Sequence, residues 1–139
     1  MMMGNSIPEN MFAPCGMDCA VCYVRLKKKK ACEGCRGADT AQPEHCRKCA
    51  IKDCAFSKGF GFCFECTEFP CQTIKRLDKS YRERYGVSLI ENGRAAADYG
   101  LGVFMEQERA RWECVECGGV VSLHDGFCSE CGKVYRAKI

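Results

Sequence analysis

The feature that most constrains this chain is its supply of cysteines, most of which occur in C-x2-C pairs. Fifteen of the 139 residues are cysteine, a share near the level at which cross-links or metal ions, and not an apolar core, hold a fold together. Leu, Ile, Val and Phe supply only 26 residues, or about 19%, which is below the share expected of a chain that folds by burying apolar surface. We therefore expect the cysteines to provide much of the stability.

Metal ions fit these cysteines better than disulfide bonds, which require an oxidising compartment. The segment 1–15 has neither a basic start nor an apolar run of signal-peptide length, and no stretch has the length and hydropathy of a membrane span. Fifteen thiols also leave one unpaired in any scheme of disulfides alone. The sequence therefore predicts a cytoplasmic metalloprotein with no membrane partner.

The formal net charge of +3 treats every thiol as neutral, whereas metal-bound cysteines are thiolates. If all the cysteines and one histidine held four zinc ions, the chain would be mildly acidic. The pI is therefore no argument for a nucleic-acid partner.

The carboxy-terminal cysteines show the strongest metal-site pattern, C-x2-C-x10-C-x2-C. Its members are Cys114, Cys117, Cys128 and Cys131. Two such pairs bind through tight turns, and the residues between them form a hairpin that brings the pairs face to face. A glycine follows the second cysteine of each pair, and the segments 119–123 and 133–136 have the alternation of short strands. We interpret residues 112–136 as a four-cysteine zinc ribbon.

The eleven remaining cysteines can be divided into sites in more than one way. They are Cys15, Cys19, Cys22, Cys32, Cys35, Cys46, Cys49, Cys54, Cys63, Cys66 and Cys71. The ribbon spacing recurs in Cys32, Cys35, Cys46 and Cys49, which suggests one site and leaves seven thiols, one short of two full sites. His45 would complete the set, most naturally by joining the opening triad, or it is a surface imidazole beside a ligand pair. The chain is thus expected to hold three or four zinc ions.

The opening triad also admits a second chemistry. The spacing of Cys15, Cys19 and Cys22 is that with which radical S-adenosylmethionine enzymes hold an iron–sulfur cluster. Those enzymes need a barrel of alternating strands and helices, and this sequence shows no such alternation. Zinc is the preferred interpretation, with an iron–sulfur cluster or a redox function of the triad as alternatives.

Three helices are expected after the cysteine-rich half. The first runs from Cys71 to Tyr85 and stops at Gly86, and the second begins at Ser88 and ends near Tyr99. The third covers residues 101–112, and its last residue, Trp112, is expected to pack the ribbon against it. His124, inside the ribbon loop, is expected to support a ligand or to lie at the surface.

Basic residues raise the question of nucleic-acid binding. They are Lys27, Lys28, Lys29 and Lys30 in one run, and Lys75, Lys79 and Arg82 on one flank of the first helix. Asp78 and Glu83 are placed to pair with two of these residues at i,i+4 spacing, which is typical of an ordinary solvent-facing surface. A nucleic-acid partner therefore stays the second choice.

The ordered set of motifs resembles a prokaryotic cysteine-rich family known as domain of unknown function 3795. The resemblance rests on segments 15–22 (CGMDCAVC), 32–36 (CEGCR), 45–54 (HCRKCAIKDC), 63–66 (CFEC) and 68–71 (EFPC). It continues through 100–104 (GLGVF), 111–112 (RW) and a terminal ribbon. It implies zinc-binding cysteines and no catalytic residue. Many relatives have a longer insert after the opening triad than residues 23–31 here.

Together these patterns predict a small metal-dominated α+β fold of zinc knuckles and short helices. Residues 1–71 would form a multi-zinc domain, 72–111 a helical connector packed on it, and 112–139 the ribbon. A site closed by four thiolates has no open position for substrate, so we expect structural metals. The sequence shows no catalytic constellation. It favours an adaptor module for a protein partner, with nucleic-acid binding and an iron–sulfur or redox function as alternatives.

Overall fold

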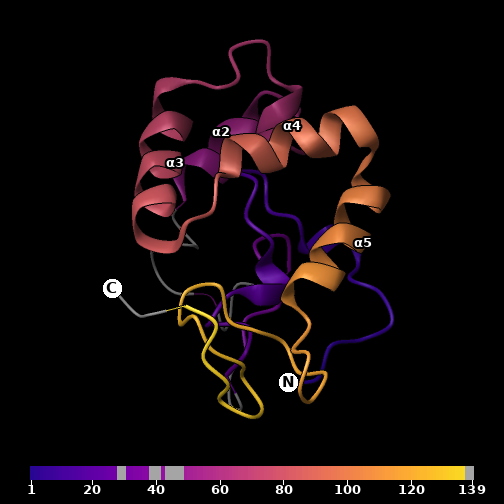
Figure 1. The fold of residues 1–139 in the computed structure, drawn as a ribbon. Coiled ribbons are helices and arrows are strands. Elements are labelled where there is room, and N and C mark those ends of the chain that lie inside the picture. The colour runs from indigo at the N-terminus through magenta and orange to yellow at the C-terminus, as the bar shows by residue number, and fades with distance from the viewer. Residues whose placement is uncertain (28–30, 38–41, 43–48, 137–139) are drawn as a thin grey trace.

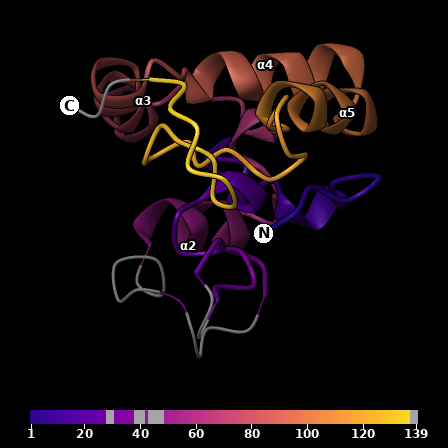
Figure 2. The ribbon, with the colours of Figure 1, turned by 60° about the horizontal axis from the view of Figure 1, so that its bottom comes forward.

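The computed structural model describes residues 1–27, 31–37, 42 and 49–136. The α-helices of this part are α2 (Ala50–Ser57), α3 (Gln72–Tyr85), α4 (Leu89–Tyr99) and α5 (Leu101–Trp112), and the 3-10 turns are η1 (Glu9–Met11), η2 (Cys19–Val21) and η4 (Cys63–Glu65). In Figure 1, α3 lies on the left, α4 along the top and α5 on the right. Figure 2 shows these three helices along one side of the molecule, with α2 on the other side. None of the helices in the described part is long and apolar enough to cross a bilayer.

The three helices expected after the cysteine-rich half are confirmed. Helix α3 ends at Gly86, whose φ of 70° is left-handed, a conformation that glycine adopts at little cost. Helix α4 begins where the Ser88 hydroxyl accepts the Glu91 N–H at 3.1 Å, which satisfies one of the free amide groups of the first turn. Helix α5 buries Phe104 and Met105.

A buried carboxylate that the sequence analysis placed at the surface joins α3 to α4. Asp78 accepts hydrogen bonds from the Arg82 guanidinium at 2.7 Å, the Ser88 hydroxyl at 2.7 Å and the Ile90 N–H at 2.9 Å. Burial alone would raise the pKa of this carboxyl, but the three donors hold its pKa below the usual value. The expected Asp78–Arg82 pair is therefore present, and it also fixes the start of α4.

The buried core draws on residues from the whole length of the chain. Phe12 is fully buried and meets Phe104 of α5 edge to face, with ring centroids 5.2 Å apart. The same cluster contains Leu89 from α4, Trp112 from α5 and Leu123 from the ribbon. Trp112 is buried between α5 and the ribbon, as expected. The division into domains 1–71, 72–111 and 112–139 stays a prediction.

The opening motif packs directly on the start of α4. Gly16 has a φ of +100°, and a Cβ at this position would lie 2.6 Å from the carbonyl oxygen of Leu89. The Asn92 side-chain amide donates to the Gly16 carbonyl at 3.0 Å. Only glycine fits here, because any side chain would strain the turn and clash with backbone.

Strand pairing in the described residues is limited to isolated bridges, so the α+β expectation is met only in its coarser form, a small cysteine-rich fold. The bridges in the ribbon join Glu113 with Val120, Val121 with Cys128, and Phe127 with Val134. The expected strands over 119–123 and 133–136 are thus shorter than the sequence suggested, because the cysteine turns interrupt each arm of the hairpin.

The amino-terminal segment adds a further chain beside the ribbon. Met2 bridges Gly119 in antiparallel fashion, and the Met3 N–H donates to the Gly118 carbonyl at 2.9 Å. The terminal amine of Met1 forms an ion pair with Glu130. The first and last parts of the described chain therefore lie side by side.

Candidate metal centre

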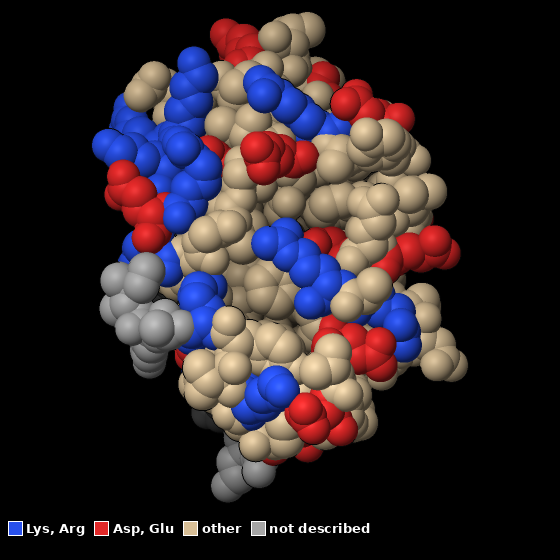
Figure 3. Space-filling model, viewed as in Figure 1, with Lys and Arg blue, Asp and Glu red and all other residues tan. Residues whose placement is uncertain are grey.

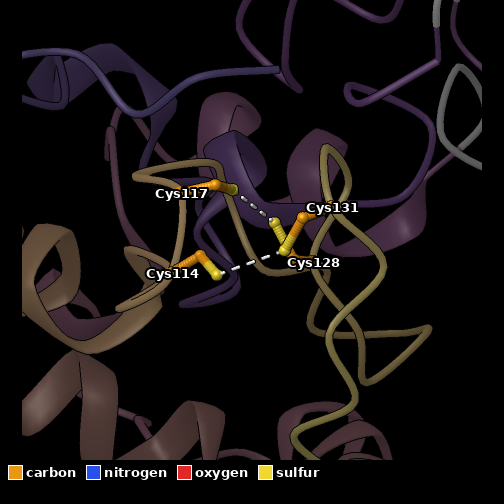
Figure 4. Close-up of side chains that lie close together, drawn as sticks. All are labelled: Cys114, Cys117, Cys128 and Cys131. Carbon is orange, nitrogen blue, oxygen red and sulfur yellow. Dashed lines mark hydrogen bonds between the residues drawn. The ribbon is translucent and has the colours of Figure 1, made fainter.

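The four ribbon cysteines converge on one point. Figure 4 shows Cys114, Cys117, Cys128 and Cys131 pointing toward one another from two turns. The sulfur atoms of Cys114 and Cys131 are 3.7 Å apart, those of Cys117 and Cys128 are 3.5 Å apart, and all four lie within 4.8 Å of one another. A tetrahedral zinc ion with bonds of about 2.3 Å would separate its sulfurs by about 3.8 Å. The arrangement therefore fits a single ion.

Backbone amides support these sulfurs. The Gly119 N–H donates to Cys117 Sγ at 3.3 Å, and the Glu130 N–H donates to Cys128 Sγ at 3.4 Å. Each contact spans two residues, and it supports the second cysteine of the first pair and the first cysteine of the second pair. Such hydrogen bonds favour the thiolate, which is the form that binds metal.

Each ribbon turn closes at a glycine. Gly118 and Gly132 have φ values of 76° and 77°, and their N–H groups donate to the carbonyls of Cys114 and Cys128. A positive φ at these positions is what brings the following chain back across the sulfurs. The two glycines noted in the sequence therefore have a direct geometric reason.

The ionisation of the ribbon thiols shows why a cation fits. A hydrogen bond from the Tyr135 hydroxyl, 3.2 Å from Cys114 Sγ, lowers the pKa of the Cys114 thiol to about 6. Although the Gly119 N–H lowers the pKa of Cys117, burial and the neighbouring thiols Cys128, Cys131 and Cys114 together raise it to about 12. Four thiolates this close therefore need a positive ion to ionise together.

The amino-terminal cysteines are arranged differently. Within the ranges 1–27, 31–37, 42 and 49–136, the ribbon quartet is the one set of three or more potential ligands whose atoms all lie within 4.8 Å. The thiol of Cys19 donates to Cys35 Sγ at 3.6 Å. This hydrogen bond raises the pKa of Cys19 and, with the charges of Lys52 and Arg36, lowers the pKa of Cys35 to about 7. Cys35 is thus the more nucleophilic thiol of this pair.

The pairing by sequence spacing placed Cys35 with Cys32, Cys46 and Cys49. In the structure the sulfur nearest to that of Cys35 by a described contact belongs to Cys19, from the opening triad. Cys46 lies outside the described residues, so the full ligand set stays a prediction.

The Cys32–Cys35 segment repeats the amide-to-sulfur contact that Glu130 makes with Cys128. The Gly34 N–H donates to Cys32 Sγ at 3.4 Å, and Gly34 has a φ of 94°. In the opening triad, burial raises the pKa of Cys22 and raises that of Cys15 to about 12. Zinc at the triad, with an iron–sulfur cluster as the alternative, stays a prediction.

The last four amino-terminal cysteines surround one cavity. Cys54 lies in α2, Cys63 begins η4 and Cys66 directly follows it, and Cys71 is the residue before α3. Cys49 precedes α2 and is half-buried. The sequence pattern did not group the four cavity cysteines, because they come from three separate elements.

The predicted ligand His45 and the basic residues Lys28, Lys29 and Lys30 lie outside the described residues. Lys27 is exposed and borders a shallow hollow together with Met1 and Glu130. The remaining predicted basic residues, Lys75, Lys79 and Arg82, are exposed on α3. The structure therefore places the described part of the basic set on two separate surfaces.

His124 has a role that the sequence analysis missed. Its ring lies among Tyr23, Tyr81 and Tyr85, and its Nε2 is 3.1 Å from the Tyr81 hydroxyl. Burial among these rings lowers the pKa of His124 to about 4. The residue therefore docks the ribbon on α3, and it neither supports a ligand nor lies free at the surface. Tyr81 and Tyr85, spaced four residues apart in α3, were the one sequence signal that could have indicated an aromatic docking surface.

Arg136 completes this contact between the ribbon and α3. Its guanidinium donates to the carbonyls of Tyr85 and Leu123, each at 2.8 Å. The ribbon is thus held by polar as well as apolar contacts.

Comparison with known families agrees with this picture. The model of the family described as "Protein of unknown function (DUF3795)" matches residues 11–76, from η1 into α3. The chain is similar to that family over these residues. The predicted resemblance is confirmed over this segment, which is a little under half of the chain and holds all eleven amino-terminal cysteines. No curated protein and no solved structure matches the chain.

Proposed function

We propose that the ribbon quartet binds one structural zinc ion and that the docked ribbon presents a surface to a protein partner. The observation that carries the metal assignment is the convergence of four sulfurs at tetrahedral spacing, supported by amide donors. A site with four protein ligands has no open coordination position for water or substrate, which favours a structural role over a catalytic one.

Exposed apolar side chains on the ribbon support the partner assignment. Val115 and Val134 are 80% and 68% exposed, and Phe127 and Tyr135 are also exposed. Phe127 bridges Val134, and the Tyr135 hydroxyl accepts the Val115 N–H at 3.0 Å, so the four residues are neighbours in the ribbon. We call this set the ribbon patch. Grouped apolar side chains on a surface are typical of protein interaction sites.

The zinc assignment is tested by native mass spectrometry of the chain purified under reducing conditions. We expect the double variant Cys114→Ser/Cys117→Ser to hold one zinc ion fewer per chain than the wild type. Equal zinc content in the two proteins would contradict the assignment.

The partner assignment is tested separately with a substitution that leaves all the cysteines in place. Val134→Glu places a charge in the ribbon patch without touching a cysteine, so zinc content should stay unchanged while a stoichiometric complex, isolated by affinity and sizing steps, is lost. Val103→Glu is a matched control on α5, because Val103 is also exposed but lies away from the ribbon. Retention of the same complex by Val134→Glu would refute the role of the patch.

Nucleic-acid binding is a second candidate, favoured by one observation. Lys and Arg side chains gather over α3 on the face shown in Figure 3. Against it, Arg82 is paired with Asp78 at 2.7 Å, and Lys79 lies 4.0 Å from Glu83. Binding to a generic oligonucleotide that weakens steeply with salt, and weakens further in Lys75→Ala/Lys79→Ala, would favour this candidate.

A further inference from the structure

Four cysteines of the amino-terminal half face a cavity that is separate from the ribbon. The cavity has a volume of about 40 Å³, and its wall contains Cys54, Cys63, Cys66 and Cys71 among aromatic and aliphatic side chains. Three of these thiols also border a second hollow on the side of α2 and α3. Packed core cysteines face no such space, so a role in filling the core does not explain this placement.

Three rigid elements bring these thiols to the cavity. Cys63 and Cys66 enclose the η4 turn, in which the Cys66 N–H donates to the Cys63 carbonyl at 3.0 Å. The Cys63 N–H in turn donates to the Pro14 carbonyl at 2.9 Å, which ties this turn to the opening motif. Cys54 is held within α2. The C-x2-C turn therefore supplies two ligands in the way that zinc sites commonly use.

The fourth thiol lies at the start of a helix. Cys71 is the N-cap residue of α3, a helix of 14 residues, and its carbonyl accepts the Lys75 N–H at 2.9 Å. Its backbone is therefore fixed where the loop after η4 enters α3. Lys58 also lines the cavity, and its ammonium lies 3.9 Å from Cys66 Sγ and 3.0 Å from the Glu68 carboxylate. One of the four sulfurs therefore lies beside this ion pair.

We propose that Cys54, Cys63, Cys66 and Cys71 form a second metal centre, independent of the ribbon, that takes one thiophilic divalent cation, with zinc as the ion. Four thiolates and one zinc ion carry a net charge of −2, and the Lys58 ammonium lies beside one of the sulfurs. No three of these four sulfurs lie within 4.8 Å of one another, so a single ion would bind all four only after the cysteine side chains turn further into the cavity. The family match covers all four residues but assigns none of them a ligand role.

Paired variants test whether these residues share one ion. Native mass spectrometry would count zinc in Cys63→Ser/Cys66→Ser, in Cys54→Ser/Cys71→Ser and in the combination of all four changes. We expect each of the three proteins to hold one zinc ion fewer than the wild type, because every one of them breaks the same site. Losses from the two pairs that add to two ions, or wild-type zinc content in the combined variant, would overturn the proposal.

A labelling experiment on the wild-type chain avoids any folding defect of the variants. Cys54 is exposed, so as a free thiol it reacts quickly with an alkylating reagent. Peptide mapping should find Cys54 protected in the zinc-loaded chain and released by a chelator together with the other three cysteines. Equal alkylation of Cys54 with and without zinc would refute the site, and iron with sulfide bound there in an anaerobic preparation would refute the assignment to zinc.

Discussion

Removing the Leu123 side chain should weaken the whole fold and not merely the ribbon. Leu123 is 1% exposed and belongs to the same buried cluster as Phe12, Leu89 and Trp112, and its N–H donates to the Val21 carbonyl at 3.0 Å. Leu→Ala changes at buried sites cost about 2–5 kcal/mol, depending on how far the site can collapse. For Leu123→Ala we expect a loss of about 3 kcal/mol, because hydrogen bonds fix the backbone on both sides of the cavity that the change creates. In a chain of this length such a loss lowers Tm by about 6–12 °C.

The assay is thermal unfolding of the zinc-loaded protein, followed by the fluorescence of its single tryptophan, Trp112. Val115→Ala is the matched control, since Val115 lies in the same ribbon and is 80% exposed. That control should change the free energy of unfolding by less than about 0.5 kcal/mol. Zinc content should be unchanged in both variants. Equal Tm values for Leu123→Ala and Val115→Ala would show that the ribbon does not depend on the core, and the docking argument would fail.

Three further predictions concern the opening turn, the histidine contact and the ribbon tyrosine. Gly16→Ala should lower the free energy of unfolding by about 2–4 kcal/mol, from left-handed strain together with overpacking. Gly59→Ala is the control, because Gly59 has a φ of +80° but a Cβ there would have nothing within 4 Å, so this change should show strain alone. Equal urea midpoints for the two variants would contradict the prediction. The pKa of His124 is about 4 in the folded chain and near 6.5 in the unfolded chain, so the unfolded chain binds a proton first as pH falls. Between pH 7.5 and 5.5 the free energy of unfolding of the wild type should therefore fall by about 1.4 kcal/mol more than that of His124→Gln. Parallel pH dependence in the two proteins would refute the contact. Tyr135→Phe should raise the pKa of Cys114 and so weaken zinc retention at pH 6 in a chelator competition, and unchanged retention would count against the role of this hydroxyl.

Local signals made the second half of the fold predictable. Helices α3 and α4 have a glycine stop at Gly86 and a serine cap at Ser88, both of which act within a few residues of the helix end. The ribbon quartet follows from spacing in the same way, because each cysteine pair and its glycine form one tight turn. These features depend little on the rest of the chain.

The amino-terminal half depends instead on contacts between distant residues. Spacing could not indicate that Cys19 and Cys35 meet at 3.6 Å, since their approach is set by the packing of the opening motif. Helix α2 was not predicted, because its eight residues follow Cys49 directly, contain Cys54 and bury only Ala55. The docking role of His124 could not be predicted either, because its contacts with Tyr81 and Tyr85 form only when the ribbon loop packs against α3.

The pairing of the first residues with the ribbon affects how the protein is made. Met3 leaves the ribosome long before Gly118, the residue whose carbonyl it binds in the finished fold, and Phe12 is translated well ahead of its partner Phe104. During most of translation, the aromatic side chains of the cysteine-rich half are therefore exposed to solvent, because the residues that bury them have not yet been made. Early delivery of metal to the growing chain would protect these thiols from oxidation during that interval.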